Sequence, residues 1–505
     1  MSTPRVACGI SILERVGDRL DQVSRPAVVA GLGALFVVSR IGFHLAGVRF
    51  DDAGLDWYYQ ILDPVLLRGD LARSLYYLHA QPPGFNLFLG LTLKIFDGSE
   101  RTVFAVVYGL LGFIACLGTL VLARGLGVRR VLALPLAALM MICPSLVIYE
   151  NWLFYDLPVM TMLAVAAMAL QRWSMGLQRR WLVVFAVALA AICLTRSFFH
   201  LGYLVLIGLC LTAAAAEQRR RVAVAILIAL SLTSSLYIKN QVVFGKFAGS
   251  TWLGMTLSET TRYGLSEADR RTLVENQIIS EISLLWPFTP LEQFPQSYQG
   301  TGGFDSIPVL TDPTKSTGKP NFNHIAYIRI ADQYATDALA LVHHRPQAYL
   351  TALAKAWYHY LRPASRENLV AENRAALGWY DSAWNAVCYG RVPLPFRINH
   401  KQAEVFILLA LGLVTAIVTA IFALYSKRPR ASWITPPRRL VIWFMFVTIV
   451  YVTVVGTLLE SGENFRFRFY VGPFYLCFFG MAIEAAVRWR CGPVVPIPDQ
   501  STGPK

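Results

Sequence analysis

Two pairs of acidic residues lie in short polar stretches between apolar segments. Asp51 and Asp52 directly follow the first apolar segment, and Glu150 and Asp156 enclose a short loop before a later one. Carboxylates with little water around them are costly unless they have partners, so they mark a candidate functional site. Because consecutive side chains of an extended chain point to opposite sides, we expect either Asp51 or Asp52 to face a cavity.

Simpler roles are open for each of these carboxylates. Asp51 and Asp52 can belong to a solvated turn before a helix over residues 55–67, with Asp56 as its N-cap. Asp156 can cap the helix that it precedes, whose positive pole favours the ionised carboxylate. Glu150 can reach solvent.

A second set of candidates is basic. Arg466 and Arg468 alternate with aromatic residues at the mouth of the last apolar segment. A guanidinium binds phosphate oxygens bidentately and stays charged at any pH, which predicts a phosphate-binding role. The alternatives are anchoring at the membrane surface and ion pairs with Glu460 and Glu463. Weaker members of the same basic set are Arg196 and Lys239.

A third set is predicted to line a substrate groove. Residues 57–67 and 71–78 predict amphipathic helices in the headgroup region, with aromatic rings at the interface. Pro82 and Pro83 then open a short helix over residues 83–96 and direct the side chains before them to the outer face. A lone histidine there is more often an anchor than a ligand. The predicted groove residues are His79, Gln81, Glu150, Glu463 and Tyr58.

Apolar helices must position these residues. Of the 505 residues, 55% are hydrophobic and 15% are charged, which is typical of a membrane protein. Since about 20 apolar residues cross the hydrocarbon, the sequence predicts about ten membrane-spanning helices. The fold class is therefore all-α integral membrane, with interfacial helices on the outer face. The predicted spans are residues 26–48, 103–123, 131–149, 157–170, 181–195, 198–216, 222–238, 404–425, 440–459 and 469–487.

Basic residues in short loops predict the orientation, because such loops stay cytoplasmic. If residues 83–96 form an interfacial or re-entrant helix, every short basic loop falls on the side of the two termini. We therefore expect a multi-pass protein of the plasma (inner) membrane with its site on the extracytoplasmic side. The predicted parts are a cytoplasmic N-terminus (1–25), a membrane module (26–238) with its first outer loop (49–102), an extracytoplasmic segment (239–403), the last spans (404–487) and a cytoplasmic tail (488–505).

The extracytoplasmic segment predicts loops and helices, not a β-rich module. Its clearest helical pattern runs from His324 to Tyr360 and breaks at Pro346. Of the 8 cysteines, only Cys388 is predicted to face outward, so we expect no disulfide on that side. The first apolar segment is too long for a signal peptide and is expected to stay in the protein.

The order of these features resembles one family. An acidic pair after the first span, a Pro-Pro pair opening an interfacial helix, an acidic site before the fourth span and a late Glu-x-x-Arg-x-Arg stretch occur in turn. They are similar to the type C (GT-C fold) glycosyltransferases, which include protein O-mannosyltransferases and the lipid A aminoarabinose transferase. The resemblance covers residues 26–238 and 440–487 and matches the long outer segment only loosely.

The resemblance implies a membrane enzyme that moves a sugar from a polyprenyl-phosphate donor to a hydroxyl on a lipid, glycan or protein acceptor. It assigns the base to Asp51 or Asp52 and a second carboxylate to Asp156. One base acting on the acceptor predicts inversion at the anomeric carbon. Relatives that bind a divalent cation, Mg or Mn, do so through loop carboxylates, for which Asp51 and Asp156 are the candidates.

Positive charge would stabilise the departing phosphate in such a reaction. The resemblance assigns this role to Arg466 or Arg468, with help from Arg196 or Lys239. Relatives often carry a basic residue just before the Pro-Pro pair, where this chain has Gln81, so that contact to the donor is missing from the pattern.

Other function classes fit the sequence less well. The 46 Lys and Arg residues fall in short clusters between apolar runs, which disfavours nucleic-acid binding. Transporters and lipid flippases usually carry ionisable residues at mid-membrane and show paired halves, whereas these spans carry almost no charge. A non-catalytic lipid-binding membrane scaffold is the remaining alternative.

Overall fold

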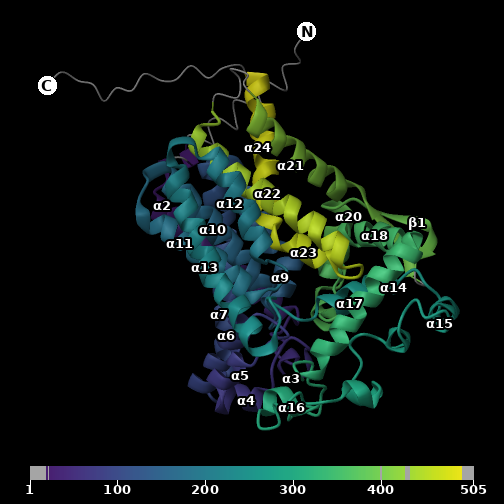
Figure 1. The fold of residues 1–505 in the computed structure, drawn as a ribbon. Coiled ribbons are helices and arrows are strands. Elements are labelled where there is room, and N and C mark those ends of the chain that lie inside the picture. The colour runs from purple at the N-terminus through teal and green to yellow at the C-terminus, as the bar shows by residue number, and fades with distance from the viewer. Residues whose placement is uncertain (1–18, 21, 399–400, 427–432, 492–505) are drawn as a thin grey trace, which may run out of the picture.

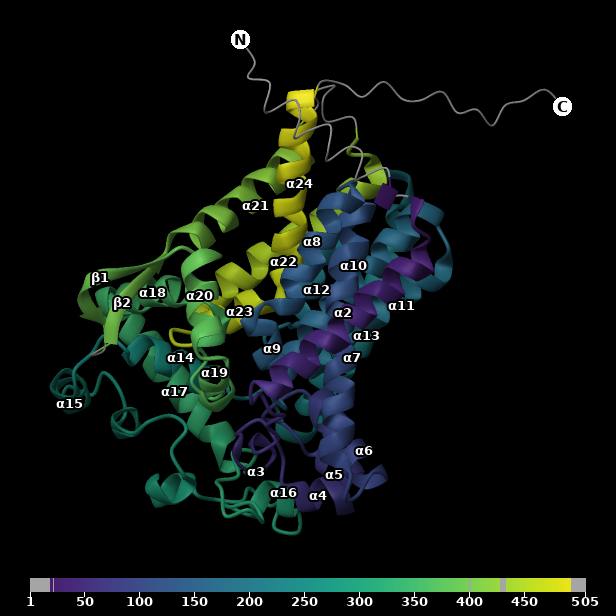
Figure 2. The same ribbon diagram turned by 180° about the vertical axis from the view of Figure 1, so that it is seen from behind.

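Long helices form a bundle, and shorter helices from the middle of the chain cover one end of it (Figures 1 and 2). The computed structural model describes residues 19–20, 22–398, 401–426 and 433–491. Most of the predicted cytoplasmic N-terminus and tail lies outside the described residues.

Each apolar segment predicted to span the membrane contains a helix of the bundle. These helices are α2 (Arg25–Leu45), α7 (Glu100–Gly125), α8 (Arg130–Ile142), α9 (Pro144–Glu150), α10 (Asp156–Gly176), α11 (Arg179–Thr195), α12 (Leu201–Ala214), α13 (Arg219–Phe244), α21 (Ile407–Tyr425), α22 (Pro436–Leu459), α23 (Asn464–Tyr470) and α24 (Gly472–Cys491).

Length and composition support a multi-pass membrane protein. Within the described ranges, 5 helices are long and apolar enough to cross a membrane, and up to 7 if each bent pair is one span. The bent pairs are α8 with α9, at 54°, and α23 with α24, at 64°. The total of about ten spans stays a prediction, because the candidates do not include α10, α11 or α12, of which α11 has 17 residues and α12 has 14.

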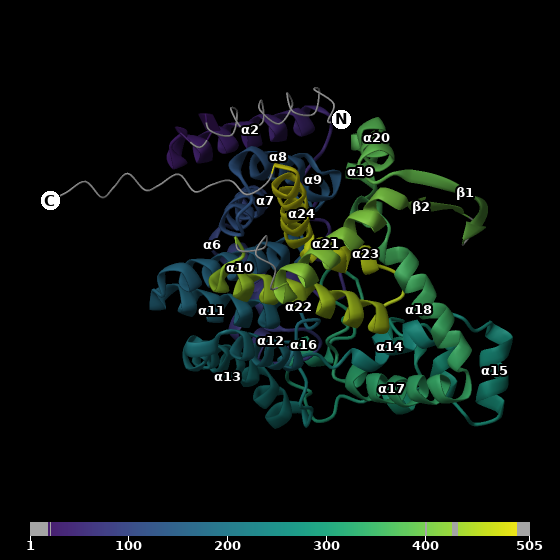
Figure 3. The same cartoon turned by 90° about the horizontal axis from the view of Figure 1, so that it is seen from above.

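The helix α10 lies at the centre of the bundle. It packs against α7, α11 and α22, which surround it in the view from above (Figure 3). Its buried side chains lie on all sides of the helix, including Asp156 in its first turn. A helix buried on every side needs apolar residues all round, which explains why its sequence lacks a polar face.

The first outer loop folds into short helices. They are α3 (Gly54–Trp57), α4 (Pro64–Gly69), α5 (Leu71–Tyr76) and α6 (Pro83–Ile95). The helix predicted over residues 55–67 is therefore wrong, because the chain breaks before Pro64. Asp63 caps α4 by accepting a hydrogen bond from the backbone N–H of Val65 at 2.9 Å, and proline suits the first helical position. Asp56 lies inside α3, so the prediction that it is an N-cap is also wrong.

Helices dominate the outer segment, and its predicted break at Pro346 separates α17 from α18. Its helices are α14 (Leu253–Arg262), α15 (Glu267–Glu275), α16 (Pro308–Thr311), α17 (Ala326–His344), α18 (Pro346–Tyr360), α19 (Ala371–Leu377) and α20 (Trp379–Val387). The outer segment also contains the 3-10 helices η2 (Glu281–Leu284), η3 (Leu291–Gln293), η4 (Gln296–Tyr298) and η5 (Ala364–Arg366). A further 3-10 helix, η1 (Ala216–Gln218), connects α12 to α13 in the bundle.

A two-stranded antiparallel hairpin joins this segment to α21. It consists of β1 (Arg391–Ile398) and β2 (Lys401–Phe406). The span predicted to begin at residue 404 begins at Ile407 instead, because Glu404 and Phe406 pair with β1. Val392, Phe396 and Val405 give this stretch the β-branched and aromatic residues that favour strands.

Candidate active site

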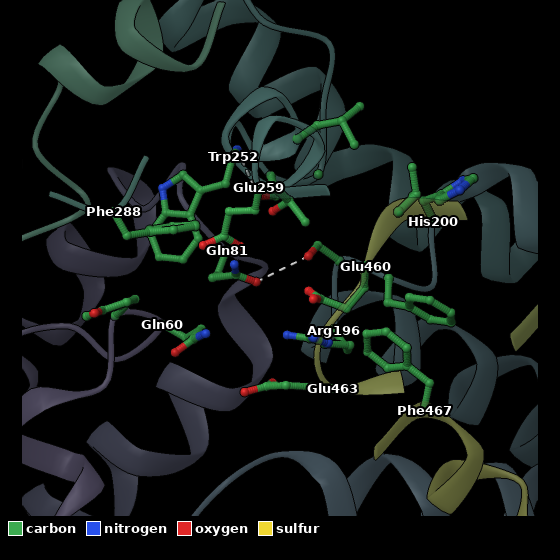
Figure 4. A pocket seen from close by; sticks show the side chains of 18 of the residues that line it. Gln60, Gln81, Arg196, His200, Trp252, Glu259, Phe288, Glu460, Glu463 and Phe467 are labelled. Carbon is green, nitrogen blue, oxygen red and sulfur yellow. Dashed lines mark hydrogen bonds between the residues drawn. The ribbon is translucent and has the colours of Figure 1, made fainter. Parts of the chain in front are cut away.

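A cavity of about 780 Å³ lies between the bundle and the outer segment. Segments far apart in the chain line it, and each contributes a polar side chain. Figure 4 shows Gln81 from the loop before α6, Arg196 from the linker after α11, Glu259 from α14, and Glu460 and Glu463 from the turn after α22. The fold thus gathers carboxylates, an amide and a guanidinium around one space.

Arg196 presents its charge to this cavity. Its guanidinium stacks on the Tyr155 ring, 4.4 Å from the centroid, and donates a hydrogen bond to the Tyr155 hydroxyl. Among the described residues no carboxylate forms an ion pair with it, and its Nε has no hydrogen-bond partner. A partly buried guanidinium without a carboxylate partner favours an anionic ligand. Sequence reasoning ranked Arg196 below Arg466 and Arg468.

Arg466 is buried at the edge of the cavity, and the protein already neutralises its charge. It donates a hydrogen bond to Asp156 at 2.9 Å and another to Glu463, and its Nε lies 3.7 Å from Glu367. Its guanidinium carbon lies 5.1 Å from the centre of the Trp152 ring. The ion pair with Glu463, one of the alternatives raised by the sequence, therefore forms within the last outer loop, and the ion pair with Asp156 connects this loop to the second one.

Arg468 and Lys239 bind backbone carbonyls and do not line the cavity. Arg468 donates to the carbonyl of Tyr360 at 2.8 Å and to that of Arg362 at 2.5 Å, which holds the end of α18. Lys239 donates to the carbonyl of Leu78 at 2.6 Å. These cations bind backbone carbonyl groups near helix ends, which have no partner within the helix.

Asp51 lies outside the cavity, and in space a single residue, Trp152, separates it from Arg466. Its backbone N–H donates to the carbonyl of Asn151 and its carbonyl accepts from Leu153, both at 2.9 Å, so Asp51 pairs with Trp152, whose ring contacts Arg466. The carboxylate accepts a hydrogen bond from the backbone of Ala53 at 3.0 Å. Partial burial raises the pKa of Asp51.

Asp52 and Asp156 take different positions. Asp52 lies 3.5 Å from Arg101 and does not reach the cavity. Asp156 is fully buried in the first turn of α10, where it binds Arg466 and does not cap the helix. The structure thus brings Asp156 together with Arg466 and Glu463, and it leaves Asp51 and Asp52 on the far side of Trp152.

Glu150 is enclosed by the bundle, so the expectation that it reaches solvent is wrong. It forms an ion pair with Arg40 of α2 at 2.5 Å. Arg40 also donates to the carbonyl of Met141 at 2.7 Å. Space for the carboxylate exists because residue 112 is glycine: a Cβ there would lie 2.3 Å from the Glu150 Oε2. Glu150 therefore holds α2 against α9 and does not line the predicted groove.

His79 connects the first loop to the outer segment. Its Nε2 lies 2.9 Å from the carbonyl of Asn323, so this nitrogen carries the proton, and its Nδ1 accepts from the Thr251 hydroxyl at 2.8 Å. Burial lowers the pKa of His79 to about 3, which keeps the ring neutral. Gln81 does line the cavity, where it accepts a hydrogen bond from Ser197 at 3.2 Å.

Tyr58 is buried behind the cavity wall. Its hydroxyl accepts a hydrogen bond from the Trp152 indole, and its carbonyl accepts one from Lys315 at 2.9 Å. The next residue, Tyr59, lines the cavity and stacks on Phe288 with ring centres 5.5 Å apart. The cavity is thus lined by the neighbour of Tyr58 and not by Tyr58, which was predicted to line the groove.

Two carboxylates of the cavity were missed as site residues. Glu259 and Glu460 face the cavity with Glu463, and burial together with repulsion from Glu463 raises the pKa of both Glu259 and Glu460. Glu460 also accepts hydrogen bonds from the backbone N–H groups of Ser461 and Gly462, both at 3.0 Å. Glu460 stood in the late acidic stretch as an ion-pair candidate only, whereas no local pattern distinguishes Glu259.

Glu367, next to Arg466, is a further buried carboxylate that the sequence did not single out. Burial and the charge of Glu463 raise its pKa to about 7. It follows Pro363 in an irregular stretch with no motif around it, so only its tertiary position distinguishes it.

The residues do not fit the divalent-cation site suggested for Asp51 and Asp156. In the ranges that the structure describes, no group of three or more His, Cys, Asp or Glu side chains is placed to hold a metal ion. One oxygen of Asp156 binds Arg466, and one of Asp51 binds its own turn.

Comparisons with known proteins give loose similarities. No family model and no curated protein match the chain. It is similar to the solved Archaeoglobus fulgidus oligosaccharyltransferase, with 13% identity and a TM-score of 0.44 over 92% of this chain, and spans 51% of that protein. It is also similar to ArnT from Cupriavidus metallidurans, with 14% identity and a TM-score of 0.34, covering 91% of this chain and 78% of ArnT. Scores of this size establish no shared function.

Proposed function

We propose that the chain is a membrane glycosyltransferase that moves a sugar from a polyprenyl-phosphate donor to an acceptor hydroxyl on the extracytoplasmic side. The observation that carries the proposal is a cavity beside the bundle in which Arg196 has no carboxylate ion pair among the described residues, while Glu259 and Glu460 face the same space. A sugar on a lipid phosphate already has a good leaving group. The reaction then needs positive charge for the phosphate and a base for the hydroxyl.

In this proposal Arg196 binds the donor phosphate and Glu460 accepts the proton of the acceptor hydroxyl. The two backbone N–H groups at 3.0 Å stabilise the ionised form of Glu460. Burial and the charges of Glu460 and Glu463 raise the pKa of Glu259 well above its ordinary value, which favours the protonated form that can donate a hydrogen bond to the substrate. The acceptor oxygen forms a bond to the anomeric carbon while the bond from that carbon to the phosphate oxygen breaks. This displacement inverts the configuration of the anomeric carbon.

Asp51 is a second candidate for the base. The resemblance implies that Asp51 is the base. Its half-buried carboxyl group has a raised pKa, and in space only Trp152 separates Asp51 from Arg466. Single variants separate the two candidates: Glu460→Gln should abolish turnover if Glu460 is the base, and Asp51→Asn should do so if Asp51 is. If turnover is lost in Asp51→Asn and normal in Glu460→Gln, the acceptor binds on the Trp152 side. The proposed reaction class is then unchanged.

The reaction class is tested with purified protein in liposomes and a panel of radiolabelled polyprenyl-phosphate sugars. We expect label to leave the lipid for an added lipid, glycan or peptide acceptor. Arg196→Gln should remove this transfer, while Arg271→Gln, on the exposed surface of α15, should keep it. Labelled lipid that crosses the bilayer intact would indicate a flippase, and binding without transfer or transport would indicate a scaffold; either result contradicts the proposal.

A further inference from the structure

The helix α20 buries two polar residues and exposes large apolar ones, with Ser382 as an exposed polar residue and Tyr380 and Trp384 half-buried. Trp379 is 80% exposed and Val387 73%, and Ala383, between them, lies on the same exposed face. In contrast, Asp381 and Asn385 are buried and hydrogen-bond to each other at 3.0 Å. A surface helix in water shows the opposite pattern, with its apolar stripe turned to the core.

The position of α20 explains this pattern. The Tyr380 hydroxyl donates to the carbonyl of Ile142, the last residue of α8, at 2.5 Å, and its ring lies 5.6 Å from that of Phe43 in α2. Just beyond the helix, the Tyr389 hydroxyl lies 3.5 Å from the sulfur of Cys143. The helix is therefore seated at the break between α8 and α9, and α2, α20 and the hairpin lie along one side of the molecule (Figure 3).

If α8 and α9 form one bent span that begins at the basic loop, their break lies inside the hydrocarbon. From Arg130, in the basic loop, to Ile142 the helix rises by about 18 Å, because each residue adds about 1.5 Å. The hydrocarbon is about 30 Å thick, so the Tyr380 hydroxyl lies about 12 Å from the nearer hydrocarbon boundary on the cavity side. Since this is too far for a tyrosine side chain to reach from the surface, the backbone of α20 must also be inside. This estimate does not depend on which side of the membrane is the outer one.

We propose that α20 dips into the bilayer leaflet on the side of the cavity and packs its exposed face against lipid acyl chains. Two neighbouring candidate spans also expose large apolar side chains, Leu45 of α2 at 80% exposure and Leu411 of α21 at 57%. The helix satisfies its own backbone, and the buried Asp381 and Asn385 keep their polar groups away from the hydrocarbon. The exposed Arg397 of the adjoining hairpin suits the phosphates of lipid headgroups.

The helix would then anchor the outer segment in the membrane beside α2 and the break between α8 and α9. Gly378, with a φ of +49°, makes the turn between α19 and α20 in a conformation that favours glycine. The interaction surface does not depend on the proposed reaction, because none of its residues lines the cavity.

The test is a depth measurement on the full chain in liposomes of phosphatidylcholine and phosphatidylglycerol. A nitroxide is attached to a single cysteine at Ala383→Cys, with the native cysteines replaced, and its collisions with oxygen and with a water-soluble nickel chelate are measured. Native Cys388, exposed at the end of α20, serves as a second single site that needs no substitution in the helix. The controls are Val38→Cys on the lipid face of α2 and Arg271→Cys in water.

We expect both labels to collide with oxygen as often as the Val38→Cys control and several-fold less often with nickel than the Arg271→Cys control. Nickel collisions equal to those at residue 271 would place α20 in water and overturn the proposal. Protection from both reagents would mean that protein, such as a second copy of the chain, covers the helix, and would also overturn it. Agreement between the two sites shows that the Ala383→Cys substitution has not displaced the helix.

Discussion

Arg196→Gln tests the core of the proposed mechanism. The substitution removes the charge that faces the cavity and the stacking on Tyr155 at 4.4 Å, while the carboxylates of the cavity remain. Arg466 cannot replace it, because Asp156, Glu463 and Glu367 already surround that guanidinium. The donor phosphate should therefore lose its main cationic partner.

The expected loss follows from the strength of charged hydrogen bonds. A hydrogen bond to a charged group contributes about 1.5–3 kcal/mol. Since about 1.4 kcal/mol corresponds to a factor of ten, kcat/KM for the lipid donor should fall by about 10- to 140-fold. Arg196→Lys keeps the charge but loses the planar fork and much of the stacking, so its loss should be smaller.

The assay measures initial rates against donor concentration in liposomes, together with the thermal unfolding temperature of each variant. Arg271→Gln removes an exposed arginine paired with Glu267 and controls for a general effect of lost charge. Unchanged kcat/KM in a folded Arg196→Gln protein would refute the assignment of the phosphate to this residue. A fall in rate that follows a fall in unfolding temperature would refute it as well, since the effect would then be structural.

Three further predictions concern buried charges. Because the pKa of Glu367 is raised from 4.5 to about 7, the wild type should lose up to about 3 kcal/mol of unfolding free energy as the pH rises through that window. Glu367→Gln should lose less, which thermal unfolding at pH 5 and 8 checks; equal losses would contradict it. Arg40→Met or Glu150→Gln alone should cost about 3–5 kcal/mol, and the double variant should be closer to wild type. Gly112→Ala should lower the unfolding temperature, because its Cβ would lie 2.3 Å from the Glu150 carboxylate, whereas Gly31→Ala, with open space, should not.

Much of the helical framework could be predicted from the sequence because it depends on local physics. Apolar runs must be helical to satisfy their backbone in hydrocarbon, and each predicted run contains a helix. Proline marks positions where a helix begins, as at Pro83 and Pro346. Pro64 follows the same rule and begins α4, which is why a single helix over residues 55–67 does not form.

The candidate site was harder to predict because its chemistry depends on partners. The sequence does not distinguish the roles of Arg196, Arg466 and Arg468. Of these three, only Arg196 faces the cavity without a carboxylate ion pair among the described residues. No sequence motif surrounds Glu259. It belongs to the candidate site because the turn after α22 brings Glu460 and Glu463 close to it.

The amino-acid sequence alone determined that this is a helical membrane protein with most of its charged residues in the loops between apolar helices, because hydropathy and helix termini act within about 20 residues. Tertiary structure decided which charges are neutralised. Asp156 and Arg466 are 310 residues apart, and Glu150 and Arg40 are 110 apart. An ion pair depends on distances of a few ångströms in space, and only the packing of the whole chain sets those distances.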